Sequence, residues 1–178
     1  VKAGGTRVYL EAGEQKKLKD LVYGMLINSG NDAAVAIAEY LGGSVEGFAQ
    51  IMNQKARELG AQHSHFVNPS GMPDENHVTT ARDMALIARY AMHNETFRQI
   101  VATKEYPWSG QAWKPGKIVN HNRLLWDYEG ATGIKNGYTN AAGQTFVASS
   151  ERDGQKLIAV VLKVPGASKN VYRDFTTL

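Results

Sequence analysis

The sequence predicts an α+β fold in which helices come first and an antiparallel sheet follows. Apolar residues recur at helical spacing in the first 101 residues, whereas β-branched and aromatic residues gather in the last third. Asp153-Gly154 separates two of these later runs, which is a strong hairpin signal. The 178 residues, 43% of them hydrophobic, are enough for one domain with a sizeable core.

Two helices are predicted before residue 60. Residues 31–41 place apolar side chains on one face, and Gly42-Gly43 ends this helix. Ser44 is expected to cap the next helix, which continues to Gly60. Its predicted inward stripe consists of Phe48, Ile51, Met52, Lys55 and Leu59.

A third helix is predicted after residue 80. Thr80, with Asp83 three residues later, resembles a capping box, and an apolar stripe follows it. Before this helix, residues 63–76 contain two prolines and a glycine. This composition predicts an irregular connection.

The sheet is expected from the last third of the chain. Residues 144–151 and 155–164 form the hairpin, and residues 130–139 are expected to supply a third strand. Residues 169–178 are expected to form a final helix that is cut off by the end of the chain.

Composition excludes several classes of protein and site. Lys plus Arg number 20 and Asp plus Glu 17, a formal charge of +3 without a dense basic patch, so no nucleic-acid partner is expected. The longest apolar runs have six residues, against the roughly 18 to 20 of a membrane span. The absence of cysteine removes disulfides, thiol nucleophiles and Cys-ligated zinc.

The tripeptide Ser29-Gly30-Asn31 has two interpretations. Ser29 and Asp32 fit a capping box for the helix over residues 31–41. Alternatively, a hydroxyl and an amide are held at a helix entrance and face a cleft. Both can be true of one tripeptide.

Lys135-Asn136-Gly137-Tyr138-Thr139 lies on or beside the expected third strand. Taken alone, it also fits a turn with a solvated lysine. Together with the earlier tripeptide it is more informative. Ser-x-Asn, followed about a hundred residues later by Lys-[Thr/Ser/Asn]-Gly on a strand, matches the later parts of the serine penicillin-recognising signature.

With these motifs the sequence resembles the D-alanyl-D-alanine carboxypeptidases, the low-molecular-mass penicillin-binding proteins of bacterial cell-wall metabolism. The resemblance runs from about residue 11 to residue 163. It rests on residues 21–34, 65–73, 80–83, 122–126, 133–139, 142–143 and 147–149. It implies a penicillin-binding transpeptidase-like domain, with an antiparallel sheet flanked by helices. Residues 1–178 are expected to form a single catalytic-type domain, truncated at both ends.

The resemblance also implies the chemistry, which is acyl transfer through a serine ester on peptidoglycan stem peptides that end in D-Ala-D-Ala. Ser29 and Lys135 would relay a proton to the departing D-alanine, and Asn31 would orient the substrate through its amide carbonyl. The strand over residues 135–139 would pair with the extended peptide. Asn136, Gly137, Tyr138 and Thr139 would then bind substrate, with the Tyr138 N–H as one half of an oxyanion hole.

Two departures from the family pattern stand out. The family nucleophile is the serine of an upstream Ser-x-x-Lys motif, and none of the eight serines here is followed by lysine at that spacing. The nucleophile is therefore expected outside this chain, in a longer gene product or on a complementary fragment that carries Ser-x-x-Lys. The second departure is Asn136, where the family usually has threonine.

Alternatives remain open, namely a β-lactamase or endopeptidase of the same superfamily, or a non-catalytic peptidoglycan-binding relative. His63, His65 and His77 invite a metal interpretation, but without an acidic ligand cluster we expect no metal, and no cofactor either. The resemblance implies inhibition by β-lactams and a place outside the cytoplasm, in the bacterial cell envelope or periplasm. Membrane attachment would come only through a segment outside this chain.

Overall fold

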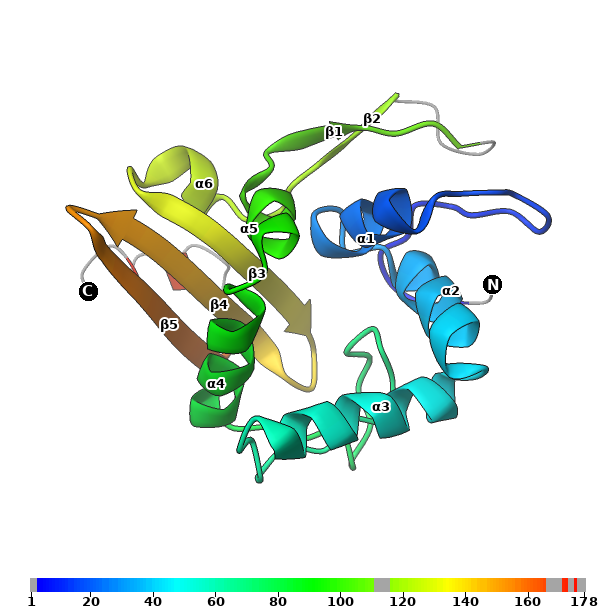
Figure 1. The fold of residues 1–178 in the computed structure, drawn as a ribbon, viewed down its shortest axis with the longest axis horizontal. Helices are drawn as coiled ribbons and strands as arrows, with labels where there is room; N and C mark the ends of the chain where they lie inside the picture. The colour runs from blue at the N-terminus through cyan, green and yellow to red at the C-terminus, as the bar shows by residue number, and fades with distance from the viewer. Residues whose placement is uncertain (1–2, 111–115, 166–170, 173–174, 176–178) are drawn as a thin grey trace. The chain divides into compact units, whose positions relative to one another are not determined.

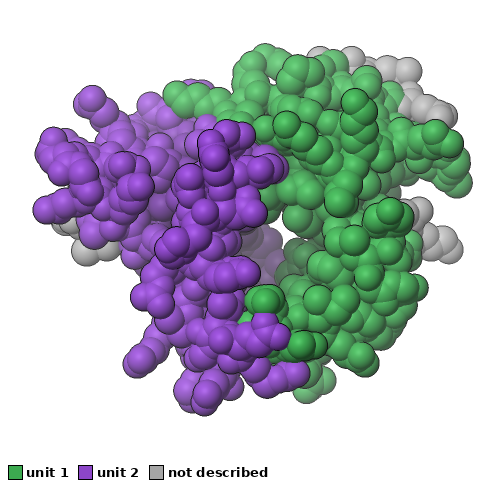
Figure 2. All heavy atoms as spheres, viewed as in Figure 1, with its two compact units in different colours: residues 1–55, 65–77, 103–121 green, residues 56–64, 78–102, 122–178 purple. Residues whose placement is uncertain are grey.

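The computed structural model describes residues 3–110, 116–165, 171, 172 and 175. These fall into two compact units, coloured separately in Figure 2. Unit 1 comprises residues 1–55, 65–77 and 103–121, and unit 2 comprises residues 56–64, 78–102 and 122–178. Along the chain the elements are α1 (Leu18–Leu26), α2 (Asn31–Gly42), α3 (Val45–Glu58), α4 (Ala81–Ala91), α5 (Glu95–Ala102), β1 (Glu105–Pro107), β2 (Lys117–Val119), α6 (Leu124–Asp127), β3 (Ala131–Thr139), β4 (Gly143–Arg152) and β5 (Gln155–Val164).

The ends of α2 and α3 confirm the sequence prediction. Gly43 follows α2 in the left-handed conformation, with φ of +73°, which is the backbone geometry that favours glycine after a helix. The Ser44 hydroxyl oxygen accepts a hydrogen bond from the Gly47 N–H at 3.0 Å and so caps α3.

The predicted stripe of α3 is only partly confirmed, since Phe48, Met52 and Leu59 are half-buried. Ile51 is 48% exposed and Lys55 is also exposed, whereas Ala49, Asn53 and Ala56 are buried. The reason is a tertiary contact, since the Asn53 amide both donates to the Phe66 carbonyl and accepts from the Phe66 N–H, each at 2.7 Å. These two hydrogen bonds offset the cost of burying the polar Asn53 side chain, so the face of α3 that carries Asn53 can be buried.

The hairpin and the third strand are confirmed. Strands β3, β4 and β5 form an antiparallel sheet in that order. Asp153 and Gly154 have φ of +49° and +77°, the signs that a type I′ hairpin turn requires at both central positions. The Asp-Gly pair therefore sets the register of β4 on β5.

Helices cover both faces of this sheet in unit 2 (Figure 1). Phe146 and Ala148 of β4 point to one face and form a core with Leu124, Val171 and Phe175. On the other face α5 lies close to β3, because a Cβ added to Gly133 would lie 2.8 Å from Val101 Cγ2. The α+β class, an antiparallel sheet flanked by helices, is thereby confirmed.

The start of α4, the connection before it and the C-terminal residues were also predicted. Thr80 caps α4 by accepting from the Asp83 N–H at 3.1 Å, and residues 63–76 form an irregular connection, both as predicted. Of the final helix expected over residues 169–178, Val171, Tyr172 and Phe175 are helical and the remainder lies outside the described residues.

Unit 1 contains elements that the sequence analysis did not predict. Strands β1 and β2 pair antiparallel but have only three residues each, too short for a periodic pattern. Tyr106 of β1 stacks on Tyr23 of α1, with ring centroids 3.7 Å apart, and donates to Asp20 at 2.7 Å. This hydrogen bond, together with burial and the carboxylate charge, raises the pKa of Tyr106 to about 12.

Within the described part of the chain, every helix is too short or too polar to cross a bilayer.

Candidate active site

The site residues predicted from the sequence fall into two groups, one in each unit. Ser29 and Asn31 belong to unit 1, at the start of α2, and Lys135 to Thr139 belong to unit 2, on β3.

Ser29 is not the cap of α2, so the capping-box interpretation is wrong. The N-cap is Gly30, and no side chain makes a capping hydrogen bond there. Ser29 itself has φ of +59°, a left-handed conformation that is uncommon for residues other than glycine. Such strained residues cluster at functional sites, so this geometry favours the second interpretation of the tripeptide.

Asn31 is held by main-chain partners in the N-terminal segment. Its N–H donates to the Thr6 carbonyl at 2.8 Å, and its side-chain Nδ2 donates to the Gly4 carbonyl at 2.6 Å. The nitrogen side of the amide is therefore turned toward Gly4. The amide oxygen is the acceptor that Asn31 can offer to a substrate N–H.

Asp32 is a residue of this corner that sequence reasoning did not assign to the site. Its carboxylate is 2% exposed and accepts from the N–H groups of Val8 and Leu10, both at 3.0 Å. The sequence does place an acidic residue directly before Ala33 and Ala34, on a helix with many apolar residues, which indicates that its carboxylate needs a partner if it is buried. Its partners lie 24 and 22 residues away, however, so the local pattern does not identify them.

Lys135 is a half-buried residue on β3. Its Nζ donates to the Asn136 carbonyl at 2.8 Å. Burial removes water from the ammonium group and lowers the pKa of Lys135 from 10.5 to about 8. A lysine in this range can hold and release a proton near neutral pH, which suits proton transfer in catalysis.

Strand register divides the predicted substrate-binding residues between the two faces of the sheet. Lys135 pairs with Val147 and Asn136 with Phe146, and neighbouring residues of a strand point to opposite faces. Thr139, four residues after Lys135, therefore lies on the lysine's face of the sheet. Asn136 and Tyr138 lie on the face of Phe146.

Three residues of this segment have further contacts. Tyr138 is 60% exposed, and its hydroxyl donates to Asn140 Oδ1 at 3.0 Å. The Thr139 hydroxyl oxygen accepts from the Ala142 N–H at 3.0 Å, which leaves its own proton for donation. A Cβ at Gly137 would lie 2.9 Å from Thr145 Oγ1 of β4, so a larger residue there would displace the Thr145 hydroxyl.

The outer edge of β3 is suited to bind an extended peptide. Among the described residues β3 has one partner strand, β4, and it is the first strand of its sheet. An unpaired strand edge presents a row of N–H and carbonyl groups to an incoming chain.

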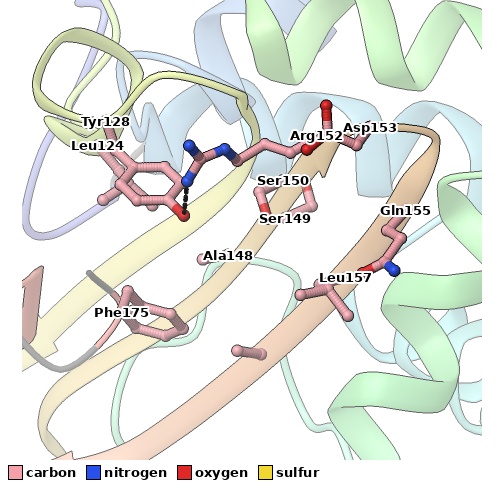
Figure 3. Close-up of a pocket in the computed structure, with 11 residues that line it drawn as sticks. Leu124, Tyr128, Ala148, Ser149, Ser150, Arg152, Asp153, Gln155, Leu157 and Phe175 are labelled. Carbon is pink, nitrogen blue, oxygen red and sulfur yellow. Dashed lines mark hydrogen bonds between the residues drawn. The ribbon is translucent and has the colours of Figure 1, made fainter. Parts of the chain in front are cut away.

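A cavity of about 330 Å³ lies elsewhere in unit 2, between β4, β5 and α6 (Figure 3). Among its lining residues, the Arg152 side chain extends toward Tyr128, and its guanidinium donates to the Tyr128 hydroxyl at 3.2 Å. None of the site residues predicted from the sequence lines this cavity. We therefore do not assign it to the candidate active site.

The histidines considered for a metal have other contacts. His77 Nδ1 accepts from the Val67 N–H at 3.1 Å, and His63 Nδ1 lies 4.0 Å from Asp83 Oδ1. Burial lowers the pKa of His77, which favours the neutral ring that can accept this hydrogen bond. The described residues contain no cluster of three or more His, Asp or Glu placed to hold a metal ion.

Comparison with known proteins gives consistent matches. A family model described as D-alanyl-D-alanine carboxypeptidase matches residues 2–166. The chain is 40% identical over 158 residues to the D-alanyl-D-alanine carboxypeptidase DacF of Bacillus subtilis, covering 89% of this chain and 41% of DacF. It is 32% identical over 166 residues to DacD of Escherichia coli, covering 92% of this chain and 42% of DacD. The chain thus spans less than half the length of these relatives.

Solved structures resemble this fold closely. A variant of a Streptomyces DD-transpeptidase superposes with a TM-score of 0.90 at 31% identity, covering 97% of this chain and 70% of that one. A D-alanyl-D-alanine carboxypeptidase from Mycobacterium tuberculosis superposes with a TM-score of 0.87 at 34% identity, covering 99% and 67%. These likenesses confirm the expected transpeptidase-like fold.

Proposed function

The chain belongs to the D-alanyl-D-alanine carboxypeptidase family, and from this premise we propose that the complete protein is a serine-type carboxypeptidase acting on peptidoglycan stem peptides. The observation that carries the proposal is Lys135, whose pKa is lowered to about 8 on a strand with an open edge among the described residues. A lysine with a lowered pKa on a strand that can bind a peptide would be able to transfer a proton to or from that peptide.

The reaction we propose proceeds through an acyl-enzyme. The hydroxyl of a Ser-x-x-Lys serine elsewhere in the complete protein attacks the carbonyl of the penultimate D-alanine, and the lysine of that motif takes its proton. The C–N bond breaks, and the departing D-alanine amine receives a proton from Lys135 through the Ser29 hydroxyl. Water then hydrolyses the serine ester and releases the shortened peptide.

Substrate binding uses the main chain of β3. We propose that the extended stem peptide pairs with its open edge and that the Tyr138 N–H donates to the developing oxyanion. The nucleophile's own N–H would be the second donor. The Asn31 amide oxygen accepts an N–H of the peptide, and Asn136 or Thr139 donates to its terminal carboxylate.

The proposed partners and location follow from this substrate. β-Lactams acylate the same serine, and the nucleophile lies in a longer product of the gene or on a complementary fragment. Peptidoglycan places the enzyme outside the cytoplasm, in the bacterial cell envelope or periplasm.

The test of the proposed function is intact-mass analysis after incubation with a penicillin, together with assays on a D-Ala-D-Ala peptide. The complete protein is expected to gain the mass of one penicillin and to release D-alanine. Residues 1–178 alone are expected to gain none, because none of their eight serines has a lysine three residues later. A stoichiometric adduct on residues 1–178 would place the nucleophile within the chain. Rapid penicillin hydrolysis without peptide cleavage would indicate a β-lactamase.

Substitution of Asn136 tests how the substrate carboxylate is bound. If Asn136 donates to that carboxylate, Asn136→Ala should weaken kcat/KM by about 1.5 to 3 kcal/mol, the range for hydrogen bonds to charged groups. Asn136→Thr should retain most of the activity. A peptide amidated at its C-terminus should be nearly insensitive to both changes.

The comparison of acid and amide substrates separates Asn136 from Thr139. Equal losses on both substrates would mean that Asn136 shapes β3 without binding the carboxylate. Thr139, which lies on the same face of the sheet as Lys135, is then the donor to examine through Thr139→Ser and Thr139→Val.

A further inference from the structure

A strap formed by residues 4–10 runs along the corner that carries Ser29 and Asn31. Five hydrogen bonds join the strap to residues 28–32. They are Asn31 Nδ2 to the Gly4 carbonyl at 2.6 Å, the Asn31 N–H to the Thr6 carbonyl at 2.8 Å, Asn28 Nδ2 to the Arg7 carbonyl at 3.2 Å, and the Val8 and Leu10 N–H groups to the two Asp32 carboxylate oxygens at 3.0 Å.

Burial is concentrated at the middle of the strap. Val8 is buried, and a Cβ added to Gly30 would lie 3.2 Å from Val8 Cγ1. Asp32 is buried under the same segment, whereas Gly4 and Gly5 are exposed. The strap is thus anchored at Val8, and its exposed end extends to the Asn31 amide.

We propose that this strap is a positioning element of the active site, with Asp32 and Gly5 as its positioning residues. Asp32 fixes the path of residues 8–10, and the Gly4 and Thr6 carbonyls then orient the Asn31 amide so that its oxygen faces the substrate. The proposal rests on the proposed function, since Asn31 is taken to bind the stem peptide. The proposal goes beyond that function because it assigns a role to residues 4–10, none of which takes part in the proposed reaction.

Gly5 provides a sharp test because a side chain at this position would collide with the amide of Asn31. It has φ of +74°, and a Cβ there would lie 2.7 Å from Asn31 Nδ2. Gly13 is the matched control, with φ of +82° and nothing within 4 Å of an added Cβ. Alanine therefore introduces similar backbone strain at both positions, but displaces the Asn31 amide only at position 5.

The experiment compares Gly5→Ala and Gly13→Ala in the complete protein. Nuclear magnetic resonance of selectively ¹⁵N-labelled asparagine follows the Asn31 side-chain NH₂ signal, which is assigned by its loss in Asn31→Asp. Gly5→Ala should shift or broaden this signal and lower kcat/KM for the peptide about 10²-fold, because misplacement by about 1 Å can cost that much. Gly13→Ala should change neither, and both variants should unfold at similar temperatures. The pH profile of kcat/KM should keep its shape, since Lys135 is not altered.

Asp32→Asn tests the anchor, with Asp83→Asn as its control. Both carboxylates are 2% exposed in the first turn of a helix, and Asp83 accepts from the His63 N–H and the Ser64 hydroxyl at 2.7 and 2.8 Å. Asp32 accepts from Val8 and Leu10 through both oxygens, whereas Asp83 accepts both of these hydrogen bonds at Oδ2. Each variant replaces charge-assisted hydrogen bonds with weaker neutral ones, so both lose stability. Only Asp32→Asn should also alter the Asn31 signal and kcat/KM.

Three results would overturn the proposal. They are equal behaviour of the two glycine variants, an unchanged Asn31 signal in Gly5→Ala, and activity losses in Asp32→Asn and Asp83→Asn that follow stability alone. Failure of the proposed function is a separate result, because an inactive wild-type protein shows it before any variant is made. In that case the Asn31 signal still decides whether the strap orients the amide.

Discussion

Lys135→Ala is expected to lower kcat/KM of the complete protein for a D-Ala-D-Ala peptide by about 10²-fold or more, the loss typical of removing a positioned proton-transfer group. In the proposed reaction this variant lacks the desolvated ammonium that would give its proton to the leaving D-alanine. The matched control is Lys156→Ala on β5 of the same sheet, because the Lys156 side chain is largely exposed and its ion pair with Glu151 is long, at 3.5 Å. Steady-state kinetics with both variants measure the difference, and similar losses would contradict a role for Lys135 in proton transfer.

The pH dependence fixes the direction of that transfer. If the protonated lysine is the active form, kcat/KM should fall as the pH rises through about 8, where Lys135 loses its proton. Lys135→Arg keeps its charge throughout this range, so its lower residual activity should lack the decline near pH 8. A rate that instead increases through pH 8 would make Lys135 a base.

Ser29→Ala is expected to lower turnover of the same peptide by about 10²-fold, because the proposed reaction needs the Ser29 hydroxyl to pass a proton to the leaving amine. The variant should still fold, since the N-cap of α2 is Gly30 and alanine must adopt the same left-handed backbone as serine.

Ser44→Ala is the control for Ser29. The Ser44 hydroxyl caps α3, so its removal should lower the free energy of unfolding by about 0.5 to 2 kcal/mol and leave turnover of the folded protein intact. Thermal unfolding and kinetics of the two variants should thus show opposite patterns. A large loss of stability with normal activity in Ser29→Ala would restore the structural interpretation of that residue.

Sequence reasoning succeeded where the signal is local. The type I′ turn between β4 and β5 requires positive φ at both central residues, and Asp153-Gly154 is one of the few dipeptides that adopt this conformation readily. Gly43 and Ser44 mark helix ends through their own backbone and side-chain chemistry, without help from distant residues. The strand that carries Lys135 followed from the same local pattern.

It failed where a distant partner decides the structure. The inward face of α3 is set by the Asn53 amide on Phe66, across 13 residues, and periodicity cannot weigh such a contact. Ser29 and Asp32 have the spacing of a capping box, yet the Asp32 carboxylate accepts from Val8 and Leu10. Helix α1 begins at Leu18, and its N-cap residue, Lys17, makes no side-chain capping hydrogen bond, so the start of this helix carried no signal.

In the candidate site, too, local motifs were visible in the sequence and contacts with distant residues were not. The residue types of Ser29, Asn31 and Lys135 were available from the motifs, and their roles came from the family resemblance. The left-handed backbone of Ser29 and the placement of Lys135 and Asn136 on opposite faces required the structure. The strap was invisible because it depends on main-chain carbonyls, which every sequence contains.

The burial of Lys135 lowers the free energy of unfolding at neutral pH, although the same burial gives the lysine the pKa that suits proton transfer. Its pKa of about 8 in the folded protein lies below the ordinary 10.5, so the unfolded chain binds more protons between these values, and stability rises with pH across that window. At neutral pH the folded protein therefore holds a charge at a free-energy cost, which an uncharged side chain of similar length would remove. Under the proposed role of Lys135, selection for turnover would keep this lysine, whereas selection for heat resistance alone would favour its replacement.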